Sequence, residues 1–374
     1  MRSARGDTIS PIALAPPRDG ARLQLSLDTE IQAEAERLVQ RAMIENDAQS
    51  VVAISLDPRT GGVLAMASAP GTQDRAYGDS LPEELRLRAI ADQYEPGSTF
   101  KTVTVAAGLD RKVITPDTLF AVNECIRIYD RRICDAESHG PEQLTVADIL
   151  RVSSNVGAVQ IAYKKLSGPN DDDRGQFFAP YIERFGFGRK TGIDLPGEVA
   201  GQVPDYHQWS GTTIGNIPFG QGLASTPIQL TAFYAMIAND GVWIQPHVVD
   251  RVGADLVRPR TVRMLPRRVT RQLASMLQGV VGVNGTGERA AIPGYSVAGK
   301  TGTTQKVING RYSKKHYVGF FVGFAPARHP RVVTLVLVDD AGAGKPYAGG
   351  ETAAPVFAQL TAKALQVLGV KKGK

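Results

Sequence analysis

The stretch that decides the fold is residues 294–304, which read GYSVAGKTGTT and fit two patterns with different chemistry. The first eight residues match G-x-x-x-x-G-K-[ST], a loop in which backbone N–H groups and a lysine cradle nucleotide phosphates. From Lys300 onward the stretch reads KTGT, one of three separated elements of a class of serine acyl-transfer enzymes. The neighbouring residues decide between a phosphate loop and an acyl-transfer site.

The neighbours of this stretch do not suit a phosphate loop, which needs a buried strand before it and a helix that begins at its Lys-Thr. The preceding segment, GVNGTGERAAIP, is polar, Gly-rich and ends in proline. The variable positions YSVA are typical of a strand. After Thr301 the chain reads GTTQKVINGRYS, where glycine, β-branched residues and Asn-Gly argue against a helix. Both flanks are wrong, so we reject the nucleotide interpretation.

A serine and a lysine with the spacing S-x-x-K lie far upstream in YEPGSTFKTVTVAAGLD, where Pro-Gly predicts a turn and a helix is predicted to begin at Ser98. One helical turn places Ser98 and Lys101 on the same face. A neutral lysine can activate a serine hydroxyl. Lowering a lysine pKa from about 10.4 to near 7 costs about 4 kcal/mol and requires burial or a second cation, for which Lys300 is the candidate. Alone, Ser98 would be a helix cap and Lys101 an exposed lysine.

The third element is S-x-N, at Ser153-Ser154-Asn155, where the helical pattern TVADILRVSSNVGAVQIAYKKL changes character. By itself it is a small polar cluster that is more often structural than catalytic. A second KTG, which begins at Lys190, lies in the Gly/Pro-rich FGFGRKTGIDLPGE and is interpreted as a loop. The acyl-transfer hypothesis depends on the conjunction: S-x-x-K, S-x-N and KTGT occur in that order, each in a suitable local structure.

The remaining pattern predicts strands at both ends of the chain and helices between them, an α+β domain with a sheet built from distant segments. Strands are expected at LQLSL (23–27), in the hairpin SVVAISLDPRTGGVLAMASA, and in the last third at YSVAGKTGTT, HYVGFFVGFAP and RVVTLVLVDD, with a helix from 352 to about 368. Two helix starts are well marked. Asp28 is expected to cap a helix whose apolar face is Ile31, Ala35, Leu38, Val39 and Ala42. In the second helix, Thr226 is the cap, Pro227 takes the first helical position and Gln229 completes a capping box. Gly241 ends this helix.

Composition and cysteine context narrow the class of protein. The chain has 374 residues, 43% of them apolar, and a net charge of +6 with interspersed charges, which excludes a disordered polymer and argues against nucleic-acid binding. No apolar run approaches the roughly 18 residues that span a bilayer. In CIRIYDRRIC, a Tyr-Asp turn sets Cys125 opposite Cys134, the register of a cross-strand disulfide expected in an oxidising compartment. The alternative is a pair of free thiols on a loop.

From about 23 to 368 the chain resembles the transpeptidase domain of class B penicillin-binding proteins, in EPGSTFK, SSN and KTGT and also in VVAISLDPRTGGVLAMASAP, FGFGRKTGIDLPGE and FGQGLASTPIQLTAFYAMIANDG. Overall likeness favours the division type over the cell-shape type. The resemblance implies a penicillin-binding protein/serine β-lactamase-like fold, an antiparallel sheet flanked by helices with a mostly helical insertion at about 98–290. It implies a tail at 1–22, the domain at 23–369 and a basic tail at 370–374.

The resemblance also implies a mechanism. Ser98 would attack the D-Ala-D-Ala bond of a peptidoglycan stem peptide or a β-lactam, with Lys101 as its base, before a second stem peptide takes the acyl group. Ser153 would relay a proton, and Asn155 would hold the substrate amide and orient Lys101. The rest of the site would lie on the KTGT strand: Lys300, Thr301 and Thr303 would bind the terminal carboxylate, Gly302 would keep the strand open for an extended peptide, and the N–H groups of Ser98 and Thr303 would form the oxyanion hole.

No cofactor or metal is implied. By family, the partners are lipid-linked precursor polymer, a cell-wall glycosyltransferase, and division or elongation proteins. No membrane helix fits before Leu23, so we expect an isolated catalytic domain whose parent is anchored in the cytoplasmic membrane and faces outward. The same three motifs leave open a serine β-lactamase or a D,D-carboxypeptidase, and also a penicillin-recognition domain that signals without turnover.

Overall fold

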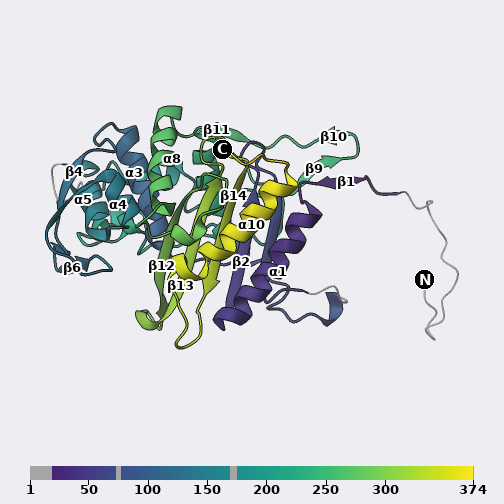
Figure 1. Cartoon of the computed structure of the whole chain (residues 1–374), viewed down its shortest axis with the longest axis horizontal. Coiled ribbons are helices and arrows are strands. Elements are labelled where there is room, and N and C mark those ends of the chain that lie inside the picture. The colour runs from purple at the N-terminus through teal and green to yellow at the C-terminus, as the bar shows by residue number, and fades with distance from the viewer. Residues whose placement is uncertain (1–18, 73–76, 169–174, 374) are drawn as a thin grey trace.

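The fold centres on a five-stranded antiparallel sheet to which both halves of the chain contribute. A computed structural model describes residues 19–72, 77–168 and 175–373 (Figure 1). The strand order is β12-β13-β14-β2-β3. The bounds are β2 (Ser50–Leu56), β3 (Val63–Ala69), β12 (Ala298–Ile308), β13 (Arg311–Ala325) and β14 (Val332–Asp339). The predicted α+β class is confirmed, and β14 joins the two halves by pairing with β13 on one side and β2 on the other.

Helices cover both faces of this sheet, which explains why its central strands are apolar on both sides. Successive residues of β2 pack into two different apolar cores: Val51 faces the core shared with α1 (Thr29–Asn46) and α10 (Ala354–Val367), and Val52 faces the core shared with α7 (Pro227–Ala238). Alternate residues of a strand point to opposite faces. A strand between two helical layers is therefore buried along its whole length, as β2 and β14 are.

The first helix begins and packs as predicted. The carboxylate of Asp28 accepts hydrogen bonds from the backbone N–H groups of Glu30 and Ile31 and so satisfies two donors that lack an intrahelical partner. The buried residues of α1 are the five predicted: Ile31, Ala35, Leu38, Val39 and Ala42. The helix predicted from 352 to about 368 is instead divided into α9 (Gly349–Thr352) and α10. Pro355 explains the new start, because proline fits only the first turn of a helix.

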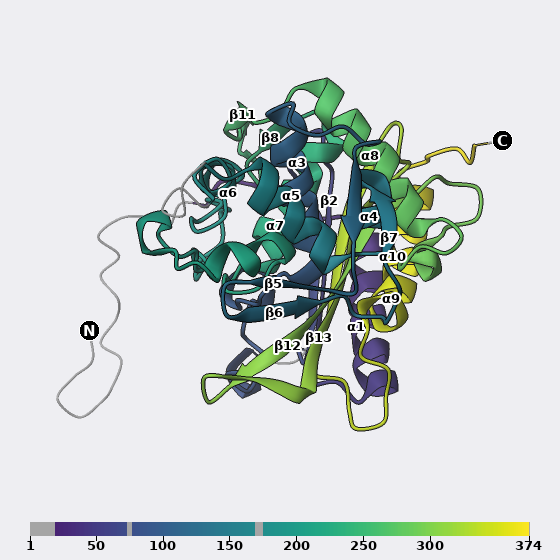
Figure 2. The ribbon, with the colours of Figure 1, turned by 90° about the vertical axis from the view of Figure 1, so that its left-hand side faces the viewer.

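Between β3 and β12 lies a helical layer with small sheets (Figures 1 and 2). Its helix α7 is buried and begins with the predicted capping box of Thr226 and Gln229. The other helices are α2 (Arg88–Ala91), α3 (Lys101–Asp110), α4 (Val146–Arg151), α5 (Asn155–Lys165), α6 (Ala179–Arg184) and α8 (Arg267–Val281). The paired strands are β4 (Leu119–Val122) with β7 (Glu142–Thr145), β5 (Cys125–Ile128) with β6 (Arg131–Cys134), and β8 (Val242–Ile244) with β11 (Thr261–Arg263).

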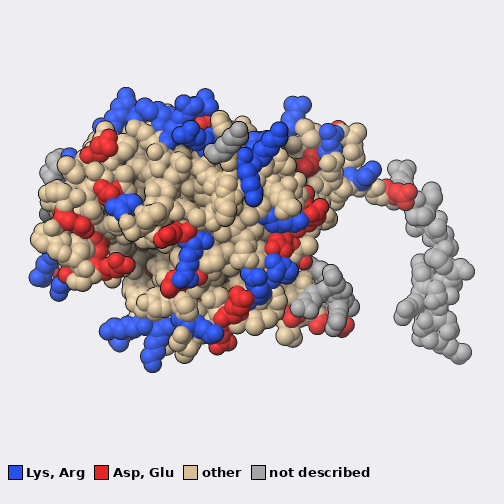
Figure 3. Space-filling view, viewed as in Figure 1, with Lys and Arg blue, Asp and Glu red and all other residues tan. Residues whose placement is uncertain are grey.

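Three strands differ from the prediction in extent or pairing. The strand expected at 23–27 is β1 (Leu23–Leu25), which pairs with β9 (Val249–Val252) beside β10 (Asp255–Leu256) and not with the main sheet. β12 and β13 extend beyond the core to a tight turn at Asn309 and Gly310, whose φ angles are 51° and 73°. Positive φ at both central residues is the backbone of a type I′ hairpin turn. Lys and Arg side chains gather at this tip (Figure 3).

The ends of the chain add little to the described structure. Most of the tail expected at 1–22 lies outside the described residues, as does residue 374 of the basic tail. Among the helices that the structure describes, none is both long and apolar enough to cross a bilayer.

Candidate active site

The predicted nucleophile lies on a tight turn that packs against the KTGT strand. Ser98 belongs to a 3-10 turn, Gly97–Phe100, and the α-helix predicted to begin at Ser98 begins at Lys101. Gly97 has a φ of +53°, and a Cβ placed on it would lie 3.1 Å from the carbonyl oxygen of Thr303. Only a residue without a side chain suits both the left-handed backbone and this close approach. The turn therefore sets Ser98 directly against β12.

Two buried lysines from distant elements meet at one hydroxyl group. Lys101 of α3 and Lys300 of β12 are both fully buried. Ser153 Oγ lies 3.1 Å from Lys101 Nζ and 2.9 Å from Lys300 Nζ, and Lys101 also donates to the Ser153 carbonyl oxygen. The S-x-x-K, S-x-N and KTGT elements therefore converge, although some two hundred residues separate the first from the last. The hydrogen bonds of Lys101 Nζ in the described structure go to Ser153 and not to Ser98.

Burial is the main reason why these lysines lose their protons easily. Burial lowers the pKa of Lys101 to about 7, and the negative charge of Asp135 partly opposes this effect. Burial, and then the positive charge of Lys101, lower the pKa of Lys300 well below its usual value. The sequence leaves burial and a second cation open as causes of a lowered lysine pKa, and burial is the larger cause for both amines. Near neutral pH the pair therefore offers a neutral amine behind the wall of the cleft that Ser98 lines.

Ser153 is held in an uncommon backbone conformation between two helices. Its φ is 63°, in the left-handed region, where a non-glycine residue costs about 1 kcal/mol or more. α4 ends just before it and α5 begins just after it. Ser154 caps α5 by accepting a hydrogen bond of 2.9 Å from Gly157 N. The helical pattern therefore breaks where the sequence changes character, and the break turns the Ser153 hydroxyl toward the lysines.

Sequence reasoning missed Asp135, which holds the start of α5. Its Oδ1 accepts hydrogen bonds from the backbone N–H groups of Asn155 and Val156, and its Oδ2 accepts from Ser154 Oγ at 2.8 Å. The Asn155 side chain donates to the carbonyl oxygen of Cys134 at 2.9 Å. This differs from the predicted orientation of Lys101 by Asn155. Asp135 lies 20 residues before Asn155, and no motif relates an aspartate to a helix start at such a separation. Its only signal in the sequence is its place directly after Cys134.

The threonines of β12 lie on the cleft wall and are themselves held in place. The hydroxyls of Thr301 and Thr286 are 2.7 Å apart, and Thr303 Oγ1 accepts from Gly349 N at 3.1 Å. Thr286 was also missed, because it lies in the polar GVNGTGERAAIP segment, where no periodicity marks it. The KTGT strand thus presents oriented hydroxyl groups to a ligand.

Gly302 is needed for a reason that the sequence did not suggest. A Cβ on Gly302 would lie 2.9 Å from Thr99 Cγ2 and 3.1 Å from the Pro96 carbonyl oxygen. The turn that carries Ser98 occupies this space. The glycine therefore permits close packing of the serine turn on β12, whereas we had expected it to leave room for a peptide.

These residues border a cleft of about 620 Å³ between the helical layer and β12, visible as a hollow in Figure 3. Ser98, Ser153, Asn155 and residues 301–303 line it. Lys101 and Lys300, being fully buried, lie behind its wall. The charged residues of the lining are mainly acidic: Asp135, Glu137, Glu142, Glu288 and Glu351, with His139 and Arg289.

The second KTG has a structural role away from this cleft. Thr191 donates from its backbone N–H and its hydroxyl to Glu198, both at 2.6 Å, and Gly192 N donates to the same carboxylate at 2.9 Å. Glu198 is buried, whereas Lys190 is exposed. These contacts agree with the interpretation of this segment as a loop.

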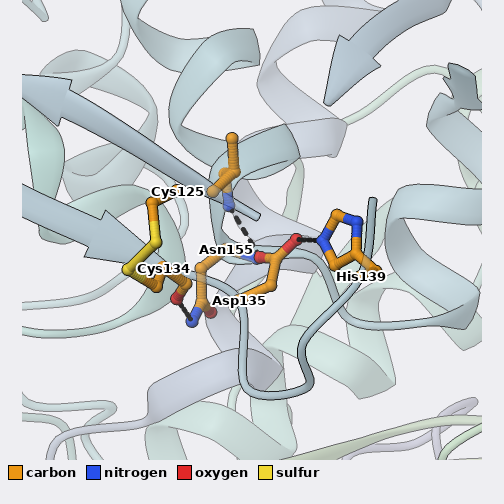
Figure 4. The surroundings of a disulfide bond; sticks show 6 residues. Cys125, Cys134, Asp135, His139 and Asn155 are labelled. Carbon is orange, nitrogen blue, oxygen red and sulfur yellow. Dashed lines mark hydrogen bonds and ion pairs between the residues drawn. A yellow bond between two sulfur atoms is a disulfide. The ribbon is translucent and has the colours of Figure 1, made fainter. Parts of the chain in front are cut away.

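The two cysteines form a disulfide across the β5–β6 hairpin (Figure 4). The register pairs Cys125 with Cys134, and Ile126 with Ile133, as the sequence predicts. The bond closes the open end of the hairpin, next to Asp135.

Comparison with known proteins places the chain in a family. The model of the penicillin binding protein transpeptidase domain matches residues 51–362. The chain is 35% identical to penicillin-binding protein PbpB of Mycolicibacterium smegmatis over 93% of its own length and 55% of the relative's. It is 34% identical to peptidoglycan D,D-transpeptidase FtsI of Escherichia coli, over 98% of its length and 60% of the relative's. The chain therefore spans little more than half of these relatives.

Solved structures agree with this result. Penicillin-binding protein 3 of Mycobacterium tuberculosis, complexed with aztreonam, superposes with a TM-score of 0.85 at 34% identity, over 95% of this chain and 81% of that one. The transpeptidase domain of Burkholderia pseudomallei penicillin-binding protein 3 superposes with a TM-score of 0.81 at 30% identity. This superposition covers 94% of this chain and 98% of that one. With converging motifs, a shared fold and a family match over most of its length, the chain belongs to the penicillin-binding protein transpeptidase family.

Proposed function

We propose that this chain is a serine-type peptidoglycan D,D-transpeptidase that β-lactams acylate. The observation that carries the proposal is the Ser153 hydroxyl held between two buried lysines in the cleft that Ser98 also lines. Such an arrangement supplies a neutral base and a path for a proton at the wall of the cleft. The names of the relatives PbpB and FtsI support a division-type role.

In the proposed reaction, neutral Lys101 accepts the Ser98 proton as Oγ attacks the carbonyl of a D-Ala-D-Ala bond. The N–H groups of Ser98 and Thr303 stabilise the developing oxyanion. Ser153 passes the proton to the leaving amine, D-Ala departs, and an acyl-enzyme remains. The amino group of a second stem peptide then attacks the ester and displaces Ser98, which forms the cross-link and returns the proton.

Lys300 has a different role because it is buried behind the cleft wall. A substrate carboxylate at the hydroxyls of Thr301 and Thr303 would favour the protonated form of Lys300, which lies 3.3 Å from Thr301 Oγ1. A charge on Lys300 in turn disfavours a charge on Lys101. Substrate binding would thus help to keep Lys101 neutral, and Asn155 on the cleft wall would hold the substrate amide.

We infer that the parent protein works on the outer side of the cytoplasmic membrane, with peptidoglycan precursors as substrates and the cell-wall synthesis machinery as partners. The Cys125–Cys134 disulfide supports an oxidising location. We also propose the division into a tail at 1–22, a transpeptidase domain at 23–369 and a basic tail at 370–374.

Intact mass after incubation with penicillin tests the proposal. The chain should gain the mass of one penicillin and keep it, and Ser98→Ala should gain nothing. An adduct on Ser98→Ala would refute the role of Ser98. Rapid loss of the adduct with repeated turnover would instead indicate a β-lactamase. Turnover of a D-Ala-D-Ala peptide or thioester distinguishes an enzyme from a silent sensor.

A further inference from the structure

The β5–β6 hairpin is a small element that its disulfide closes. Each strand has four residues, and the two strands form a sheet of their own. An isolated two-stranded hairpin is at best marginally stable in water, and here Ile128 and Ile133 pack the hairpin onto the core. Cys125 and Cys134 join its open end, and in this sheet there is no third strand to hold the register. The covalent bond ties the end of the hairpin that carries residue 134 and its successor to β5.

Those two positions hold the first turn of α5 (Figure 4). The Cys134 carbonyl oxygen accepts from the Asn155 side chain. Asp135 accepts two backbone N–H groups of α5 and the Ser154 hydroxyl, and its Oδ2 also lies 3.1 Å from His139 Nε2. The start of the helix is thus tied to the disulfide end of the hairpin by four hydrogen bonds.

The first turn of α5 in turn fixes Ser153. Ser153 directly precedes Ser154, the first of the three residues that donate to Asp135, and its left-handed backbone persists only while its surroundings impose it. Its hydroxyl is the meeting point of Lys101 and Lys300. A small shift of α5 would move this hydroxyl away from both amines.

We propose that Asp135 is a positioning residue for acylation of Ser98, and that the Cys125–Cys134 disulfide holds Asp135 in place, so that reduction of this bond slows the reaction. The inference rests on the proposed function of Ser98 and Ser153. The reductant is a dithiol: it gives two electrons and two protons to the disulfide, the S–S bond breaks into two thiols, and the dithiol becomes a cyclic disulfide.

The first experiment compares acylation of the oxidised and reduced chain by a fluorescent penicillin. Dithiothreitol is added without denaturant, and thiol titration confirms two free thiols. We expect acylation to slow by roughly ten- to a hundredfold, the range that a misplacement near 1 Å can produce. The double variant Cys125→Ser/Cys134→Ser should be equally slow, and dithiothreitol should not change its rate. Circular dichroism monitors the fold throughout.

The second experiment separates Asp135 from helix capping in general. Asp135→Ala should slow acylation by a similar factor. Asp135→Asn keeps one acceptor oxygen for the two backbone N–H groups and should restore part of the rate. The matched control is Asp28→Ala, because Asp28 also accepts two backbone N–H groups at a helix start, at 3.0 and 3.1 Å, but caps α1 on the other face of the sheet. This control should acylate at the rate of the unaltered chain.

The pH at which acylation is half-maximal is a third measurement. A purely structural role of Asp135 would leave this pH unchanged. The charged groups around Lys101 are Lys300 of β12 and Asp135 after β6, with His139 beside Asp135. Asp135 favours the protonated form of Lys101. Asp135→Asn removes that charge, so the pH at which acylation is half-maximal should fall relative to the unaltered chain. Asp28→Ala should leave this pH unchanged.

The inference is overturned if the fully reduced, folded chain acylates at the oxidised rate, or if Asp135→Ala is no slower than Asp28→Ala. An unchanged pH midpoint in Asp135→Asn would mean that Asp135 only supports the fold, and this result would also overturn the inference. These outcomes differ from failure of the proposed function, which appears as an adduct on Ser98→Ala.

Discussion

At the scale of single residues, the proposed chemistry depends on the protonation state of Lys101. Burial costs a cation its hydration, and the pKa of Lys101 falls to about 7. In the proposed reaction the base is the neutral amine of Lys101, which is the dominant form above this pH and the minor form below it. Ser153 keeps the amine in place whether or not it carries the proton, because a hydroxyl both accepts and donates a hydrogen bond.

Acylation should accordingly fall with acid. Below about pH 7 we expect the second-order rate with penicillin to drop roughly tenfold per pH unit, since each unit lowers the neutral fraction tenfold. Stopped-flow fluorescence from pH 5 to 8.5 measures the profile. Lys101→Met should lose nearly all activity, and the exposed Lys190→Met should keep the full rate and profile. A flat profile between pH 5 and 7 would contradict Lys101 as the base.

Motifs predict some residues of this site and not others. Ser98, Lys101, Ser153 and Lys300 lie in short patterns whose spacing follows from one helical turn or one strand. Asp135 acts on a helix that begins 20 residues later, and the loop between them can have any length. Such contacts arise from the packing of distant segments and carry no local signal.

At the scale of elements, the packing of the Ser98 turn on β12 is sensitive to one methyl group. Gly302→Ala forces Thr99 and the Pro96 carbonyl away from the strand. We expect overpacking to lower the free energy of unfolding by about 1–3 kcal/mol, and acylation to slow by roughly tenfold or more as Ser98 moves. Urea unfolding and penicillin acylation measure the two effects.

Gly78→Ala is the matched control, because a Cβ there would meet no heavy atom within 4 Å. It should leave acylation unchanged. If Gly302→Ala acylates as fast as this control, close packing of the turn on the strand is not what positions Ser98.

Elements with a local pattern were predicted well. The buried face of α1, the register of CIRIYDRRIC and the capping box of α7 all follow from residues within one segment. The pairing of β1 with β9 and the 3-10 turn at Ser98 did not follow, because neighbours far along the chain decide them. Both segments favour the predicted structure locally and are overruled by packing.

At the scale of the whole molecule, the buried lysines make folding stability depend on pH. The unfolded chain holds the Lys101 proton up to about pH 10.4, but the folded chain releases it near 7. Between these values the unfolded state binds more protons, so stability rises with pH. It decreases as pH falls from about 10 and levels off below about 7.

This linkage is measurable as a difference between two proteins. Between about pH 8 and 9.5, the free energy of unfolding of the unaltered chain should rise with pH more steeply than that of Lys101→Met, by about 1.4 kcal/mol per pH unit. Urea unfolding at several pH values gives both slopes, and groups common to the two proteins cancel. Equal slopes would mean that Lys101 keeps its ordinary pKa in the folded chain.

The position of β14 in the sheet has a further consequence, for the order of events during synthesis. β14 lies between β13 and β2, so the β2–β3 hairpin has no neighbour in the sheet until the last strand is made. At roughly 10 residues per second, the ribosome needs on the order of half a minute to pass from β2 to β14. During that time α1 can cover one face of the hairpin, but the β2 edge stays unpaired, and the five-stranded sheet can close only when β14 has emerged.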